Sequence, residues 1–154
     1  MCSSDLDGAR DSEAVTVIGD FFWILSKRDE KPRMYRLPLA PAEETITAEF
    51  VAEIGTWPYL SERDVYQDPL WAGGRRMPTA MTATEELLVI ATYGPMFLYP
   101  IVEHQPVFDA LPAVLNLPRT SGREAVTRAA RGLITVNERE DQHDAADIFL
   151  ITLE

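Results

Sequence analysis

The chain has 154 residues, of which 46% are hydrophobic and 25% are charged, a composition typical of globular rather than disordered proteins. Its 14 basic and 25 acidic residues give a formal net charge of −11. That charge argues against nucleic acid or an anionic membrane surface as the main partner, because both attract basic faces. The single cysteine, Cys2, excludes an internal disulfide.

The first residues contain neither a basic segment nor an apolar segment of the kind that a secretory signal needs. The longest mostly apolar stretch, residues 14–25, is interrupted by Gly19 and Asp20. A membrane-spanning helix needs about 20 apolar residues. The sequence therefore predicts no membrane span and shows no export signal.

Short runs rich in Val, Ile, Phe, Tyr and Thr follow one another along the chain, a pattern typical of β-strands. Eleven prolines and eight glycines separate these runs and leave few windows long enough for a helix. In chain order the predicted strands are 13–17, 21–27, 33–39, 50–54, 78–83, 87–93, 96–101, 108–114, 124–128, 132–136 and 147–153. Only residues 122–131 have apolar positions at helical spacing, so a helix is the alternative there.

The predicted strands fall into three units that open in the same way. Each opening strand has an alanine followed two positions later by a threonine, at Ala14, Ala80 and Ala125. An apolar strand and then a strand with an aromatic residue come next in each unit. Repeats of about 40 to 50 residues with three or four strands are typical of β-propeller blades. We therefore predict an all-β fold of antiparallel four-stranded blades, with about two and a half to three blades in an incomplete ring.

The predicted boundaries are residues 13–55, 78–115 and 122–154 for the blades and 55–77 for a Pro-, Gly- and Trp-rich insertion. The first strand of each blade should lie innermost, because its alanine fits where strands crowd near the propeller axis. The residues just before these alanines, Glu13, Thr79 and Glu124, are then expected to point toward the mouth of the central channel.

Several short motifs resemble, in order, those of an uncharacterised bacterial family of six-bladed propellers. They read DGARDSEAV at 7–15, LSKR at 25–28, MYRLPL at 34–39, TY at 92–93 with FLY at 97–99, and EAV at 124–126 with VNE at 136–138. The family is related in fold to phytase-like and esterase-like-phytase propellers. The sequence departs from this pattern in three places: Ala91 replaces an arginine before the Thr-Tyr pair, Thr84-Glu85-Glu86 replaces an SPDGRR turn, and the closing Ser-Glu-Gly reads Asn137-Glu138-Arg139.

The resemblance covers residues 7–154 and implies a periplasmic or extracellular bacterial protein whose family members begin with further blades and an export signal. We accordingly interpret the chain as a partial propeller from a metagenomic gene fragment, whose natural partner is the missing N-terminal blades of its own parent chain. Residues 1–6 are then expected to be an artefactual or disordered tail. The alternative is a mature lipoprotein that starts at Cys2.

The candidate ligand-binding residues are those expected at the channel mouth, namely Glu13, Lys27, Arg28, Thr92, Tyr93, Glu124 and Glu138. Lys27 and Arg28 belong to a basic run that could bind a phosphate-bearing substrate through charge-assisted hydrogen bonds, or be neutralised locally by Asp29 and Glu30. The Tyr93 hydroxyl could orient a ligand, although Thr92 and Tyr93 could equally be structural.

Calcium is the one cofactor that the pattern suggests. Glu13 and Glu124 occupy equivalent repeat positions and could share the ion, because hard cations take oxygen ligands, and the resemblance implies a site of this type in propeller phytases. Alternatively, each carboxylate accepts backbone hydrogen bonds or pairs with an arginine. The acidic run 138–147 lacks the spacing of an EF-hand and is interpreted as a solvated hairpin loop.

No familiar catalytic motif occurs in the sequence: G-x-S-x-G, a phosphate-binding loop, a dinucleotide-binding glycine pattern and H-E-x-x-H are all absent. Catalytic residues therefore stay unassigned. Three hypotheses follow. The chain is part of a propeller that binds a small molecule or a protein at the channel mouth, a calcium-dependent phosphoric-ester hydrolase of the phytase-like sort, or a self-contained small protein that closes its ring by oligomerisation.

Overall fold

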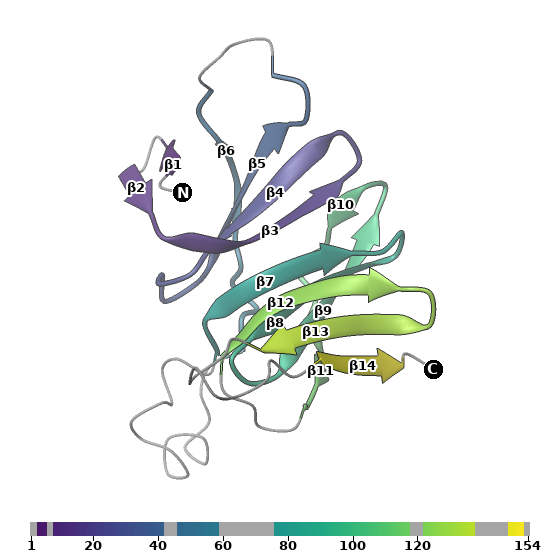
Figure 1. The fold of residues 1–154 in the computed structure, drawn as a ribbon. Coiled ribbons are helices and arrows are strands. Elements are labelled where there is room, and N and C mark those ends of the chain that lie inside the picture. Colours follow the sequence, from purple (N-terminus) through teal and green to yellow (C-terminus); the bar gives the residue numbers. More distant parts are fainter. Residues whose placement is uncertain are drawn as a thin grey trace.

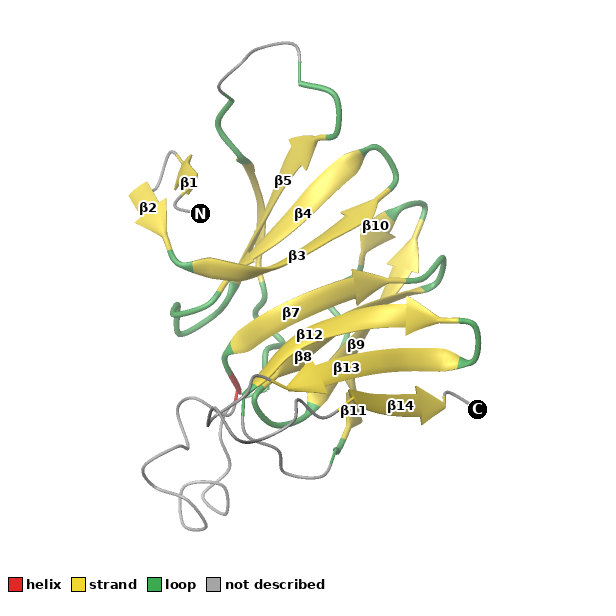
Figure 2. Cartoon of the chain, in the orientation of Figure 1, coloured by secondary structure: helices red, strands yellow, loops and turns green. Residues whose placement is uncertain are grey.

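A computed structural model describes residues 3–5, 8–41, 46–58, 76–117, 122–137 and 148–152, and their side chains from residue 11 onward. The regular structure in these ranges is almost entirely β-strand, as Figure 2 shows, and the all-β prediction is confirmed. Within the same ranges no helix is long and apolar enough to cross a membrane. The expected loop at 138–147 and most of the insertion at 55–77 lie outside the described residues.

The first blade is a four-stranded antiparallel meander in which consecutive strands pair. Its strands are β3 (Ser12–Ile18), β4 (Phe21–Ser26), β5 (Arg33–Pro38) and β6 (Glu49–Glu53). A two-residue turn joins β3 to β4, and its first residue, Gly19, has a φ of +58°, a conformation that glycine adopts without strain. Ahead of this blade, β1 (Ser3–Asp5) and β2 (Gly8–Arg10) pair as a short hairpin.

The second blade is built on β7 (Pro78–Ala83), β8 (Leu87–Thr92) and β9 (Met96–Val102). Two short strands, β10 (Gln105–Pro106) and β11 (Ala113–Leu115), share the outer edge of β9. The predicted strand 108–114 is therefore wrong over most of its length. The backbone around Pro112 has no N–H to donate at that position, so pairing with β9 begins only after the proline.

The third blade contains β12 (Arg123–Ala129), β13 (Gly132–Asn137) and β14 (Ile148–Thr152). They pair in that order as an antiparallel three-stranded sheet. Residues 123–129 form a strand, so the alternative of a helix over 122–131 is wrong.

The three sheets are arranged as neighbouring blades of a β-propeller, and within the described residues they do not close a ring. The first strands of the blades, β3, β7 and β12, lie side by side (Figure 1), and β7 contacts both of the others. Within each blade the sequence then runs outward from this inner strand. This order is the one predicted from the repeated alanines.

The two interfaces between blades are built alike. In the first, Ala14, Trp23 and Leu25 belong to one apolar cluster with Met81, Leu88 and Ile90 of the second blade. In the second, Ala80, Val89 and Ala91 belong to another cluster with Val126 and Leu133 of the third blade. The central blade is consequently buried on both faces, whereas each outer blade is buried on one.

A β-bulge recurs at the same place in the inner strand of every blade. The pairing register shifts between Ser12 and Ala14 in β3, between Pro78 and Ala80 in β7, and between Arg123 and Ala125 in β12. The extra residue is Glu13, Thr79 or Glu124, so these three side chains are structurally equivalent. A bulge bends its strand and changes the direction of the extra side chain.

Removing the Tyr99 hydroxyl should stabilise the protein. Tyr99 in β9 is fully buried, and its hydroxyl makes no hydrogen bond of normal geometry with the described residues. Burial raises the pKa of Tyr99 to about 12, and the nearby Thr56 hydroxyl opposes this rise. Because an unsatisfied buried polar group is unfavourable, Tyr99→Phe should raise the free energy of unfolding by about 1 kcal/mol in urea titrations at pH 7.

The same substitution should alter the response to alkali. A folded-state pKa above the unfolded value of about 10 stabilises the protein below pH 10, and this contribution is lost as the pH rises toward 12. The free energy of unfolding of Tyr99→Phe should therefore exceed that of the wild-type protein by a margin that grows by roughly 2–3 kcal/mol between pH 10 and pH 12. A constant difference from pH 7 to 12 would contradict the assignment.

Candidate functional site

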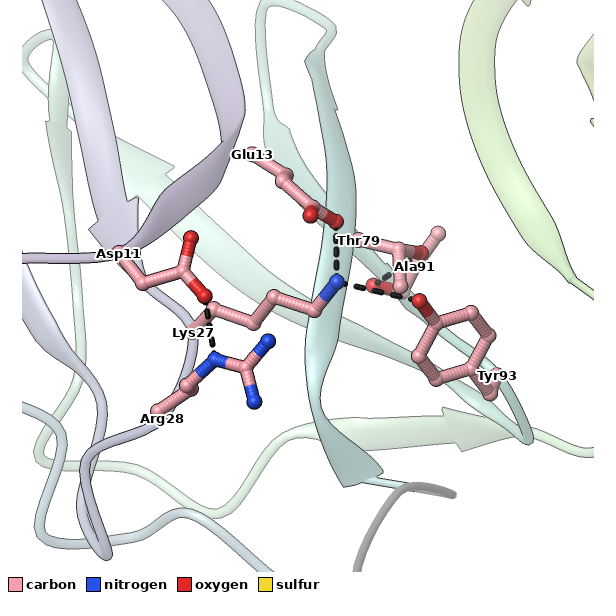
Figure 3. A network of polar contacts seen from close by, with 7 residues as sticks. All are labelled: Asp11, Glu13, Lys27, Arg28, Thr79, Ala91 and Tyr93. Carbon is pink, nitrogen blue, oxygen red and sulfur yellow. Dashed lines mark hydrogen bonds and ion pairs between the residues drawn. The ribbon is translucent and has the colours of Figure 1, made fainter. Parts of the chain in front are cut away.

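The first part of the candidate site is a buried lysine at the end of β4. Only 6% of the Lys27 side chain is exposed, and its ammonium group donates a hydrogen bond to the Glu13 carboxylate at the bulge of β3. The ammonium also donates to the Tyr93 hydroxyl over 3.1 Å and lies 5.2 Å from the centre of the Tyr93 ring (Figure 3). Lys27 therefore joins the first blade to the second by a polar contact and by a cation–π contact.

The third blade completes this group of residues. The Glu124 carboxylate, at the bulge of β12, lies close enough to Tyr93 to raise the pKa of its hydroxyl. Four of the predicted residues, Glu13, Lys27, Tyr93 and Glu124, thus come together from all three blades, and we call them the mouth cluster. The equivalent bulge residue of the second blade, Thr79, donates to the Ala91 carbonyl over 3.5 Å and closes its own hairpin instead (Figure 3).

The electrostatics of the mouth cluster keep its lysine charged. Burial lowers the pKa of Lys27, but its hydrogen bonds to Glu13 and Tyr93 raise it, and the net pKa lies above the ordinary value. Burial also raises the pKa of Tyr93, an effect that Glu124 strengthens and Lys27 opposes. Near pH 7 the pair therefore consists of an ammonium ion and a neutral phenol. Such a pair can bind and orient an anion, but neither member can act as a general base.

The other predicted residues take different positions. The Arg28 Nε atom donates to Asp11, and this ion pair is solvent-exposed at the rim of the site. Thr92 is fully buried, and its hydroxyl donates to the Pro95 carbonyl over 2.7 Å and accepts from the Gly94 N–H over 3.0 Å, which fixes the turn between β8 and β9. Glu138 lies outside the described residues.

Arg123 is a buried residue of this region that the sequence analysis missed. Its side chain is 1% exposed, and Nη1 donates to the Gly94 carbonyl and, over 3.2 Å, to the Thr92 carbonyl of the second blade. Burial lowers the pKa of this guanidinium. A charged residue at the position that holds Ser12 and Pro78 in the other blades was the one sequence signal that could have identified it.

A pocket of about 430 Å³ lies beside the mouth cluster, and Lys27 is part of its lining. The pocket is also lined by two arginines, Arg28 and Arg76, and by the acidic residues Asp29 and Glu30. Its size falls in the range of small-molecule sites.

A buried tryptophan forms one wall of this pocket. Trp57 is 6% exposed and packs edge-on against Phe97 with 4.7 Å between ring centres. Arg76 donates to the Pro58 carbonyl over 3.1 Å, and its guanidinium lies 5.8 Å from the centre of the Phe97 ring. These contacts hold an aromatic wall and a cation in fixed positions at the same pocket.

Comparisons with protein-family models, with curated proteins and with solved structures found no match. The class of this protein therefore rests on its own fold and site. It is an all-β chain of propeller blades that carries a polar cluster at one end of its inner strands. Among the described residues, no group of three or more His, Cys, Asp or Glu side chains is placed to hold a metal ion.

Proposed function

We propose that this chain binds a small anionic ligand at the channel mouth of a β-propeller. The observation that supports the proposal most directly is the position of Lys27, which is a buried, charged lysine held by residues of two blades and also lines a pocket. Burying a charge is costly even when it is paired, because the ion loses its hydration, so packing alone does not explain a lysine at this position.

The charge distribution supports an anion as the ligand. The chain as a whole carries a net charge of −11, yet the pocket lining has three basic and two acidic side chains. Lysine and arginine donors form charge-assisted hydrogen bonds with phosphate or carboxylate groups, and arginine can do so with two parallel bonds. The Trp57 wall suits an apolar or planar body attached to the anionic group. Phenyl phosphate is a simple probe with both features.

Phenyl phosphate should raise the unfolding temperature of the protein, because a ligand that binds only the folded state stabilises it. Benzamidine has a similar ring but a cationic group, and it should give no rise. Loss of one charge-assisted hydrogen bond weakens binding by about 1.5–3 kcal/mol, so Lys27→Met should raise the Kd for phenyl phosphate roughly 10- to 100-fold. Isothermal titration calorimetry would measure the Kd for phenyl phosphate of the wild-type protein and of Lys27→Met.

Lys31→Met provides the matched control. Lys31 lies in the same loop and pairs with Glu53 at 3.4 Å, but it is not part of the pocket lining. Its substitution should leave the Kd unchanged. Equal binding of phenyl phosphate and benzamidine, or equal loss of binding in the two lysine variants, would contradict the proposal.

A calcium-dependent phosphoric-ester hydrolase is the second candidate. It is favoured by the approach of two carboxylates, Glu13 and Glu124, to the same Lys27–Tyr93 pair. The Lys27 ammonium now occupies the side of Glu13 that a cation would need, so calcium binding would require Lys27 to move. If this candidate holds, millimolar calcium should raise the unfolding temperature, Glu124→Gln should remove the rise, and phosphate should be released from phenyl phosphate.

The family resemblance supports one coarser proposal about the source of the protein. We propose that this is a bacterial protein that acts in the periplasm or outside the cell.

A further inference from the structure

Each outer blade leaves one apolar sheet face uncovered by the described residues. On the first blade we call this the leading face, and it consists of Val15, Val17, Phe22 and Ile24, which share one side of β3 and β4. On the third blade we call it the trailing face, and it consists of Ala125, Thr127, Ile134, Val136, Ile148 and Leu150 on one side of β12, β13 and β14. Side chains on these faces reach 46% exposure at Val15 and 71% at Ile148.

The leading face is a surface that another blade covers elsewhere in the same chain. Val15 is equivalent in register to Met81 and Val126, which are 4% and 8% exposed because the preceding blade packs on them. Phe22 is 39% exposed, whereas its equivalents Leu88 and Leu133 are fully buried. The first blade therefore has the residues of an interface with a preceding blade.

The trailing face has the same relation to a following blade. Ala125 is exposed, whereas its equivalents Ala14 and Ala80 are 0% and 7% exposed under the next blade. Both interfaces inside the chain are formed by the trailing face of one blade and the leading face of the next. The two uncovered faces are thus the two halves of one repeating head-to-tail contact.

We propose that a second copy of this chain covers both faces and closes a ring of two chains. Propellers close with about four to eight blades. The described residues of one copy form three blades, which is too few for a ring; two copies supply six, which lies within the range, and three copies supply nine, which is too many. A head-to-tail contact forms a closed assembly when the rotation between units completes a circle, and two such contacts then relate the copies by two-fold symmetry.

The ring would also place the third blade of one copy beside Glu13 and Lys27 on the first blade of the other. This proposal stands on the blade faces alone and does not rest on the anionic ligand, so ligand binding can fail while the ring holds.

Light scattering on the purified 154-residue chain should give twice its 17.3 kDa mass. Val15→Glu on the leading face and Ala125→Glu on the trailing face should each give a single-chain mass, because each places a charge in both contacts of the ring. Both side chains are exposed in the single chain, so the variants should keep the wild-type circular dichroism. Leu111→Glu, at a loop residue that is 82% exposed, is the control and should keep the double mass.

Mixing the two variants makes the test specific for head-to-tail docking. Val15→Glu keeps its trailing face and Ala125→Glu keeps its leading face, so an equimolar mixture should regain one intact contact and the double mass. A dimer that joins like faces would not be restored in this way and would overturn the proposal. A wild-type monomer would overturn it too. Assemblies larger than two copies would exclude the closed ring.

Discussion

Trp23→Ala should lower the free energy of unfolding by about 3–5 kcal/mol, the cost of removing a large buried aromatic side chain from a packed core. Trp23 is fully buried in the cluster between the first two blades, and its indole N–H donates to the Ile18 carbonyl over 3.3 Å. Single domains are stable by only about 5–15 kcal/mol, so the variant should be partly unfolded at 37 °C.

Urea unfolding followed by circular dichroism would measure this loss without relying on tryptophan fluorescence. Val102→Ala is the matched control, because Val102 in β9 is apolar but 57% exposed. Its substitution should cost less than about 0.5 kcal/mol. If Trp23→Ala cost no more than the control, Trp23 would not hold the interface between the blades.

Arg123→Met should lower the free energy of unfolding by about 2–4 kcal/mol, since it removes two hydrogen bonds from a charged donor and leaves the Thr92 and Gly94 carbonyls without that donor. Removing the charge recovers part of the cost of burying it, which the lowered pKa of Arg123 reflects. We expect the lost hydrogen bonds to outweigh the recovered cost of burying the charge, because methionine fills the space but offers no donor to either carbonyl.

Arg128→Met, in the same strand, is the control for Arg123→Met. Arg128 is exposed, so its substitution should change the free energy of unfolding by no more than about 0.5 kcal/mol in the same urea titration. An equally small effect of Arg123→Met would show that the second and third blades do not depend on this contact.

The strands and their grouping into blades could be predicted because the sequence shows both alternating apolar residues and a repeated order of strands. Alternating apolar residues identify strands, and the recurring alanines identify which strand of each unit is crowded near the axis. The helix considered for 122–131 could not be excluded by periodicity. The structure instead has a hairpin of β12 and β13 there, and this hairpin requires a glycine at position 132. Gly132 has a φ of +145°, and a Cβ atom at this position would lie 1.9 Å from the Ile151 carbonyl oxygen.

The candidate site was predictable in its members but not in its contacts. The repeat positions of Glu13 and Glu124 are enough to predict that both lie at the same end of the blades. The direction of these side chains depends on the bulges, which leave no clear pattern in the sequence, so the partner of Glu13 could not be foreseen. Arg123 was missed for a related reason, because its partners are backbone carbonyls and carbonyls carry no sequence signal.

At the recurring bulge, the fold constrains the identity of one residue in each inner strand and leaves its neighbour free to vary. The residue after the bulged residue is alanine in all three blades and pairs with the next strand, and Ala14 and Ala80 are also buried between blades, so the fold constrains this position. The bulged residue itself is left out of this pairing, and it is glutamate, threonine and glutamate in the three blades. Duplicated blades could therefore exchange the chemistry of the channel mouth one residue at a time without disturbing the architecture that presents it.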